Sequence, residues 1–262
     1  MRLADGAEAI RGDLPGQSTR LIAVPSGAGS DLGSGVHRLS SIAAVRDELL
    51  TAVRSATRTP ITIGGDCGVE LGAIGHAVEA GRVAVVWLDA HADLNTPATS
   101  PSGAFGGMVL RTILGDGPEA VSPATPLTPD RVILAGVRAI DDAESDAIDT
   151  LGIVHLDPRL LTVETLTAAI TASGAESVYL HIDLDVIDPA EFDCVAAPEP
   201  FGISFALLIE LIAAARATLP LAGAGITGFA PGSQDAAADD LPSILRIVGA
   251  LTRATSAGPP TS

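Results

Sequence analysis

Two short stretches of the sequence concentrate side chains that bind metal ions. The first stretch, WLDAHADLN, places Asp89, His91 and Asp93 at alternate positions. The second stretch, HIDLDVIDP, repeats this alternation further along the chain. In an extended backbone, alternate side chains point to the same side. Each stretch therefore predicts a group of carboxylates and imidazoles that face one point.

The second group consists of His181, Asp183 and Asp185. Carboxylates that converge from both groups repel one another, and this repulsion forces protons onto them unless cations lie between them. Oxygen-rich ligands with one or two imidazoles suit Mn²⁺, and two ions about 3.5–4 Å apart can ionise a shared water near neutral pH. A single Asp at the end of a strand is more often a helix N-cap. Two such groups instead predict a divalent metal site.

Both stretches continue apolar runs, and these runs indicate the fold class. Seven such runs recur, each closed by Gly, Asp or Pro and followed by a helical pattern: RLIAVPS, PITIGGD, RVAVVWLDA, RVILAGVR, LGIVHLD, SVYLHIDLD and AGAGITGFAP. Runs without polar alternation are typical of parallel strands that are buried on both faces. The sequence therefore predicts an α/β fold with helices on both sides of a parallel sheet.

Helical spacing of apolar residues predicts seven helices, over 41–56, 69–80, 104–114, 141–150, 162–173, 204–218 and 236–253. Two longer linkers, 115–130 and 188–202, are rich in proline. In open α/β sheets, ligands bind at loops that follow the carboxyl ends of strands. The 188–202 loop is therefore a candidate part of the site.

Length and composition narrow the class of protein. A chain of 262 residues can bury a large core, and we expect one domain over residues 1–255 and a disordered tail, 256–262. The formal net charge of −17 opposes binding to nucleic acid and to anionic membrane surfaces. The two cysteines, and the lack of a secretory signal or a span of about 18 apolar residues, favour a cytoplasmic protein.

Three blocks of the sequence resemble, in order and spacing, the signature blocks of the ureohydrolases, the family of arginase, agmatinase and formimidoylglutamase. These blocks are GGDCG, DAHADLNTP and HIDLDVIDP...PEPFGIS. The resemblance runs from about residue 20 to about residue 250. It implies an arginase-like three-layer αβα sandwich with a mainly parallel sheet of about eight strands, one more than the apolar runs predict. It also implies a homo-oligomer, either a trimer or a hexamer.

The resemblance further implies roles for the acidic and imidazole residues. Asp89 and Asp183 would bridge two metal ions, normally Mn²⁺. His91 and Asp185 would complete one metal site. Asp93 would help to complete the other site and would orient a metal-bound hydroxide.

The family's remaining metal ligand is a histidine after Gly-Gly-Asp, where this chain has Cys67. As a thiolate, Cys67 would favour Zn²⁺, Fe²⁺ or Co²⁺ over Mn²⁺. As a buried thiol, it would leave the second ion weakly held or absent. A disulfide with Cys194 is a further alternative. A nucleophilic Cys67 paired with His91 or His181 is another, although nearby carboxylates would raise the pKa of the thiol and disfavour the thiolate.

Two glycines also depart from the family pattern. Gly106 stands where the family commonly has a proton-shuttling histidine, and Gly228 stands where it has a glutamate that binds the guanidinium group. His181 is the residue best placed to compensate, as a replacement proton carrier, an extra ligand or an outer-shell donor. We therefore expect Asp93 and His181 to be the catalytic residues.

Four residues match family positions that contact the amino-acid end of the substrate. They are Asn95, Ser102, Asp141 and Glu144. For Asp141 and Glu144, an acidic helix start that favours the helix dipole is an equally good explanation.

The function predicted from these observations is hydrolysis of the C–N bond of a linear amidine or guanidine. Metal-bound hydroxide would attack the amidine carbon and release urea or a urea-like product. The alternative is a ureohydrolase-like protein with impaired catalysis that retains one metal site and serves as a binding or assembly subunit. Gly106 and Gly228 are the residues that favour this alternative.

Overall fold

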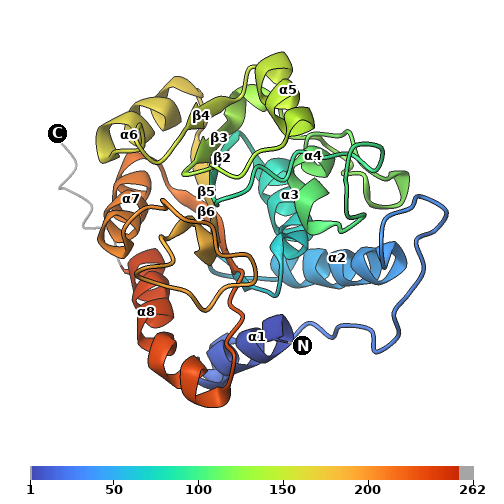
Figure 1. The fold of residues 1–262 in the computed structure, drawn as a ribbon, viewed down its shortest axis with the longest axis horizontal. Helices are drawn as coiled ribbons and strands as arrows, with labels where there is room; N and C mark the ends of the chain where they lie inside the picture. The colour runs from blue at the N-terminus through green and yellow to red at the C-terminus, as the bar shows by residue number, and fades with distance from the viewer. Residues whose placement is uncertain (1, 254–262) are drawn as a thin grey trace.

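The computed structural model describes residues 2–253, so the predicted tail, 256–262, lies outside the described residues. These residues form one mainly buried sheet between two layers of helices (Figure 1). The fold is therefore the predicted α/β class, with a parallel sheet covered on both faces.

The sheet has six strands among the described residues, in the spatial order β1-β6-β5-β2-β3-β4. All neighbouring pairs are parallel. In chain order the strands are β1 (Ile61–Ile63), β2 (Val83–Leu88), β3 (Val132–Ala135), β4 (Val154–Leu156), β5 (Ser177–Asp183) and β6 (Leu221–Thr227). The central strands β2 and β5 are buried along their length, as their uninterrupted apolar sequences predict.

Eight α-helices connect or flank the described strands. They are α1 (Arg2–Gly12), α2 (Leu39–Arg54), α3 (Glu70–Ala80), α4 (Val109–Ile113), α5 (Asp142–Leu151), α6 (Val163–Ala172), α7 (Phe205–Thr218) and α8 (Gln234–Thr252). Each of the seven predicted helices is present. The predicted helix 104–114 is shorter, because a 3-10 helix, Gly106–Met108, precedes α4.

Alternate residues of the central strands divide the core into two halves. Val86 and Leu88 pack in the half of the core with α6, α7 and α8, whereas Val85, Trp87 and Tyr179 pack in the half with α2, α3 and α4. These two groups of helices lie on opposite sides of the sheet (Figure 1). Burial of these apolar side chains stabilises the fold by roughly 1.5–3 kcal/mol for each large side chain, before the entropy cost of ordering. The second half of the core includes the face of β5 that carries His181 and Asp183.

Two segments differ from the sequence prediction. The run RLIAVPS (20–26) is not a strand, and the side chains of Leu21 and Val24 are 65% and 74% exposed. A strand requires backbone partners, and no described residue pairs with this run in the sheet. The sheet therefore has six described strands, and the predictions of seven and of about eight are corrected. Helix α1, which the sequence analysis did not predict, packs against α8 and buries Ile10.

Within residues 2–253, the structure has no helix that is both long and apolar enough to cross a membrane.

Candidate metal centre

The candidate site lies at the carboxyl edge of four adjacent strands, β1, β6, β5 and β2. Cys67 follows β1, Asp89 follows β2, Asp183 ends β5 and Thr227 ends β6. Because parallel strands end at the same edge, these side chains meet although they are far apart in sequence. This is the edge at which open α/β sheets bind ligands.

Asp89, His91 and Asp185 form the first group of donor atoms. His91 Nδ1 lies 3.1 Å from Asp185 Oδ2 and 3.4 Å from Asp89 Oδ1. Backbone N–H groups of Ala90 and His91 donate to Asp185 and Asp89 and hold the two carboxylates in place. Burial lowers the pKa of His91, but its hydrogen bonds to Asp185 and Asp89 outweigh burial and raise the pKa to about 11. The three residues offer ligand atoms within 4.8 Å of one another.

Cys67 lies in a short 3-10 helix that Asp66 caps by accepting a hydrogen bond from Gly68 N–H. The buried thiol places Sγ 3.6 Å from Asp89 Oδ2 and 3.4 Å from Asp183 Oδ2. Burial raises the pKa of Cys67 well above its ordinary value, and the charge of Asp93 raises it further. Both Cys67 and Cys194 are free, so the alternative of a disulfide is wrong. The raised pKa also argues against a nucleophilic thiolate.

Asp93 supplies a buried oxygen that fits a cation. Its Oδ2 has no hydrogen-bond partner among the described residues. Burial raises the pKa of Asp93 well above its usual range, and the charge of Asp89 raises it further. An unpartnered buried carboxylate oxygen is costly, and a divalent ion beside it removes that cost. The residues present therefore fit a metal ion.

The backbone at Asp93 is left-handed, with φ of 53°. The predicted extended alternation over Asp89, His91 and Asp93 is therefore wrong at its third position, because the backbone at Asp93 is left-handed and not extended. Strained backbone of this kind costs about 1–3 kcal/mol and clusters at functional sites.

Asp183 occupies the space next to Gly228, the position at which the family has a glutamate. Its Oδ2 accepts a hydrogen bond from Thr227 Oγ1 at 2.8 Å. A Cβ at Gly228 would lie 2.1 Å from Asp183 Oδ1, and the φ of Gly228 is 86°. A larger residue at position 228 would therefore displace Asp183. Gly106 is different, because the nearest atom to a Cβ there is Asp66 Cβ at 4.0 Å.

His181 belongs to a second, fully buried group with Asp89 and Glu70. Its Nε2 lies 3.2 Å from Asp89 Oδ2, and its Nδ1 lies 3.1 Å from Glu70 Oε1. Burial lowers the pKa of His181, but hydrogen bonds to Asp89 and Glu70 raise it to about 10. Burial raises the pKa of Asp89, but its hydrogen bonds with His181 and His91 outweigh burial and lower the pKa.

Sequence reasoning missed Glu70, which is 0% exposed. As the first residue of α3, a glutamate is ordinarily explained by the helix dipole. Tyr179 Oη donates a hydrogen bond to Glu70 Oε2. A Cβ at Gly225 would lie 1.4 Å from Glu70 Oε1, so the carboxylate occupies space that only glycine leaves open. The signal in the sequence was the glycine-rich strand β6 opposite Tyr179 and His181.

The structure gives three of the predicted substrate residues a clear structural role. Asp141 and Glu144 form a reciprocal capping box at the start of α5. Glu144 Oε1 also accepts from Leu94 N–H, and Asn95 Nδ2 donates to Asp141 Oδ2 at 2.8 Å. The hydrogen bond from Asn95 lowers the pKa of Asp141. Ser102 Oγ accepts from Ala104 N–H within its own exposed loop.

Arg138 is a second residue that sequence reasoning missed. Its guanidinium group donates to the carbonyl oxygens of Asp185 and Glu199 at 2.8 and 2.7 Å. Arg138 thereby links the 188–202 loop, which contains Glu199, to the segment that contains Asp185. A guanidinium group supplies five donors in a rigid fork, which suits this bridging role.

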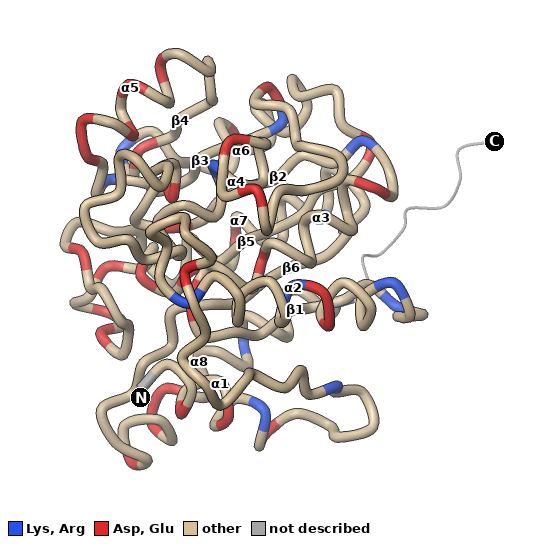
Figure 2. Tube along the Cα trace, turned by 90° about the vertical axis from the view of Figure 1, so that its right-hand side faces the viewer, with Lys and Arg blue, Asp and Glu red and all other residues tan. Residues whose placement is uncertain are grey.

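The acidic character of the chain extends beyond the site, because Asp and Glu outnumber Lys and Arg along the trace (Figure 2).

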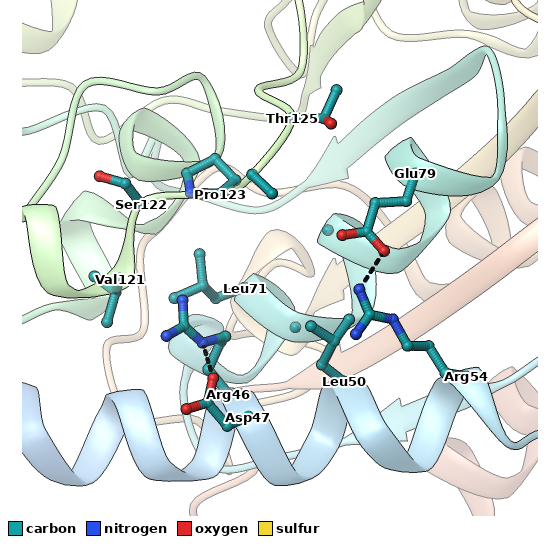
Figure 3. A pocket seen from close by; sticks show the side chains of 13 residues that line it. Arg46, Asp47, Leu50, Arg54, Leu71, Glu79, Val121, Ser122, Pro123 and Thr125 are labelled. Atoms are coloured by element: carbon teal, nitrogen blue, oxygen red, sulfur yellow. Dashed lines mark hydrogen bonds and ion pairs between the residues drawn. The ribbon is translucent and has the colours of Figure 1, made fainter.

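A separate pocket lies between α2, α3 and residues 121–125 (Figure 3). Its two arginines form ion pairs, Arg46 with Asp47 and Arg54 with Glu79. Their charges are therefore already compensated within the pocket.

The fold and the site together define a class of α/β protein that has a carboxylate–imidazole centre at the carboxyl edge of a parallel sheet. Comparison with known proteins narrows this class. The model of the Arginase family matches residues 12–241. The chain belongs to the arginase family.

Individual relatives agree with this assignment. An arginase of Bacillus caldovelox is 32% identical over 200 residues, which cover 70% of this chain and 67% of the relative. An arginase of Entamoeba histolytica is 37% identical over 155 residues, which cover 55% of this chain and 52% of the relative. These alignments span half to two thirds of the length of the curated relatives.

Solved structures match over a larger share of the chain. The structure of Entamoeba histolytica arginase in complex with L-ornithine has a TM-score of 0.80 and 27% identity, and the match covers 88% of this chain and 82% of that one. The structure of proclavaminate amidino hydrolase from Streptomyces clavuligerus has a TM-score of 0.65 at 22% identity, which supports the fold alone. The family and its relatives named arginase support a hydrolase of C–N bonds outside peptide linkages.

Proposed function

We propose that this chain is a metal-dependent hydrolase of the C–N bond of a linear guanidine or amidine, with release of urea or a urea-like product. The observation that carries the proposal is a pair of overlapping donor groups that share Asp89. Beside them, Asp93 has a buried oxygen without a partner among the described residues. Membership of the arginase family supports this reaction class.

In this proposal, Asp89 and Asp183 would help to hold both metal ions, and His91 and Asp185 would complete the first site. The ions, when bound, supply Lewis acidity and lower the pKa of water. Asp93 accepts a hydrogen bond from the attacking water at its free Oδ2 and so orients it. Mn²⁺ suits the oxygen-rich first site.

The substrate is a guanidine or amidine that does not depend on a glutamate at position 228. Glycine at position 228 offers no carboxylate to a guanidinium group, and a Cβ there would lie 2.1 Å from Asp183 Oδ1. A modified guanidine therefore fits better than unmodified arginine. The predicted substrate contacts of Asn95, Ser102, Asp141 and Glu144 stay predictions.

A metal and substrate screen tests the function. Metal-depleted protein is reloaded separately with Mn²⁺, Co²⁺, Zn²⁺ and Ni²⁺, its metal content is measured by elemental analysis, and urea release is followed with a panel of guanidino compounds. Metal-dependent urea release supports the proposal. One tightly held ion with no turnover of any compound would overturn it and would favour a ureohydrolase-like binding or assembly subunit.

The cytoplasmic location and the homo-oligomeric state, a trimer or a hexamer, are part of the same proposal. Two free cysteines are compatible with a reducing compartment. Sedimentation of the purified full chain measures the subunit count.

A further inference from the structure

The catalytic role that the sequence predicts for His181 is not part of the proposed hydrolysis, which uses Asp93 alone. His181 instead belongs to a second group of donor atoms. Cys67 Sγ, Asp89 Oδ2 and His181 Nε2 lie within 4.8 Å of one another, and all three residues are buried. Asp183 Oδ2 lies 3.4 Å from Sγ, beside this group of three.

We propose that His181 is the imidazole ligand of the second metal site, together with Cys67, Asp89 and Asp183, and that this site binds Zn²⁺, Co²⁺ or Fe²⁺ in preference to Mn²⁺. Glu70 is the positioning residue that holds His181. The inference rests on the proposed function only in placing a metal centre at this edge of the sheet.

The separations of Cys67 Sγ from the oxygens of Asp89 and Asp183, and of His181 Nε2 from Asp89 Oδ2, are close to those between two ligands of one tetrahedral ion. With Zn–S of about 2.3 Å and Zn–N or Zn–O of about 2.0–2.1 Å, tetrahedral geometry requires about 3.3 Å between nitrogen and oxygen and about 3.5 Å between sulfur and oxygen. The structure has 3.2 Å between His181 Nε2 and Asp89 Oδ2. It has 3.6 and 3.4 Å between Cys67 Sγ and the oxygens of Asp89 and Asp183.

Glu70 gives His181 the outer partner that metal-binding histidines need. A ligating histidine almost always donates its second ring N–H to a carboxylate or carbonyl, which fixes the tautomer and the ring orientation. His181 Nδ1 lies 3.1 Å from Glu70 Oε1, so Nε2 is directed to Asp89. The ring also stacks on Trp87 with 3.6 Å between centroids, and Tyr179 holds the other oxygen of Glu70.

The donor types set the choice of ion. A thiolate is a soft ligand that selects Zn²⁺ and other borderline ions, whereas Mn²⁺ prefers oxygen ligands. Binding of the ion releases the protons of the thiol and of Nε2, as in other sites of this type. The competing interpretation is that a protonated His181 bridges Glu70 and Asp89 and itself replaces the second cation. In that case the thiol is not a ligand.

Cobalt spectroscopy of the metal-depleted full chain separates these two interpretations. Titration with Co²⁺ should produce a thiolate-to-cobalt charge-transfer absorption in the near ultraviolet. Cys67→Ser should abolish this absorption, and Cys194→Ser should leave it unchanged. Absence of the absorption at saturating Co²⁺, or its persistence in C67S, would overturn the proposal. X-ray absorption of the wild-type zinc-loaded protein provides a check without mutation, because it should detect one sulfur and at least one imidazole.

The role of Glu70 has its own measurement. Glu70→Gln should weaken Co²⁺ binding at the thiolate site by about 10–100-fold, because loss of such an outer partner typically has that effect. The charge-transfer absorption should still appear at high Co²⁺. Glu79→Gln, on the same helix but paired with Arg54 at the surface, is the matched control. Equal Co²⁺ affinity in folded E70Q and E79Q would exclude Glu70 as a positioning residue.

These readouts do not depend on turnover. A chain that shows the charge-transfer absorption but hydrolyses no guanidine would retain the metal-site proposal and lose the proposed function. A chain that hydrolyses a guanidine without this absorption would have the opposite outcome.

Discussion

The two parts of the candidate centre differ in composition and in accessibility. We call Asp89, His91 and Asp185 the carboxylate half, and Cys67, Asp89 and His181 the thiol half. The side chain of His91 is 31% exposed, whereas that of His181 is 0% exposed. The carboxylate half follows the family motif, and the thiol half departs from it.

This difference shows how one metal centre can change one site and keep the other. His181 of the thiol half depends on two residues outside that half, because Glu70 holds His181 and Gly225 leaves space for Glu70. Asp89 belongs to both halves, because His91 contacts its Oδ1 and His181 contacts its Oδ2. A change at Cys67 or His181 therefore leaves the contact between His91 and Asp185 in place.

Removal of the shared residue should have the largest effect. Asp89→Asn should weaken both metal sites and lower turnover by at least about 10³-fold, because metal ions supply several kcal/mol of transition-state stabilisation. Metal content and urea release measure the two effects. Asp130→Asn, an exposed surface change, is the control. If D89N kept both ions, Asp89 would not be the common ligand.

Removal of the histidine of the carboxylate half should affect one site alone. His91→Ala should weaken binding of the first ion by more than about 100-fold, since loss of a direct ligand exceeds the loss of an outer partner. The thiolate-to-cobalt absorption of the other half should remain. His76→Ala on α3 is the control. Loss of that absorption in H91A would show that the two halves bind metal as one unit.

The sequence predicts the fold well where local patterns decide it. Six of the seven apolar runs form strands, and all seven predicted helices are present. The run at 20–26 fails because strand formation depends on a neighbouring edge, which apolar composition does not reveal. Helix α1 was missed because its sequence is more polar than those of the predicted helices, and its burial of Ile10 depends on the distant α8.

The candidate site is predictable to the extent that it lies in motifs. The structure brings Cys67, Asp89, Asp183 and His181 together at one edge, as the spacing and the resemblance predict. Glu70 was missed, because its contact with His181 spans 111 positions in sequence and the only signal for it, the glycines of β6, lies in a third segment. The left-handed backbone at Asp93 was likewise not predictable, since no local sequence pattern distinguishes a left-handed aspartate.

The two glycines that depart from the family pattern should respond differently to substitution. Gly228→Ala should destabilise the protein by about 1–3 kcal/mol, because it combines a positive φ with a contact on Asp183 Oδ1. Since Asp183 must move, metal affinity should fall as well. Gly106→Ala, where the nearest atom lies 4.0 Å away, should be close to neutral. Urea unfolding with and without metal measures both, and equal losses would show that position 228 has room for a side chain.

The smallest effect concerns the capping box beside the carboxylate half. Asp141→Ala should cost about 1 kcal/mol of unfolding free energy, as is typical when an N-cap carboxylate is removed. The hydrogen bond from Asn95 lowers the pKa of Asp141 in the folded state, so the carboxylate stabilises the fold fully above its unfolded pKa of about 3.9.

The difference in stability between wild type and D141A should therefore shrink as the pH falls below about 4, through the folded pKa of Asp141. Asp142→Ala, an exposed neighbour in α5, should show little of this pH dependence. If Asp141 also contacted substrate, D141A would raise KM in addition to lowering stability. An unchanged KM with the expected loss of stability would assign Asp141 to the helix cap alone, because a substrate contact and a cap differ only in that measurement.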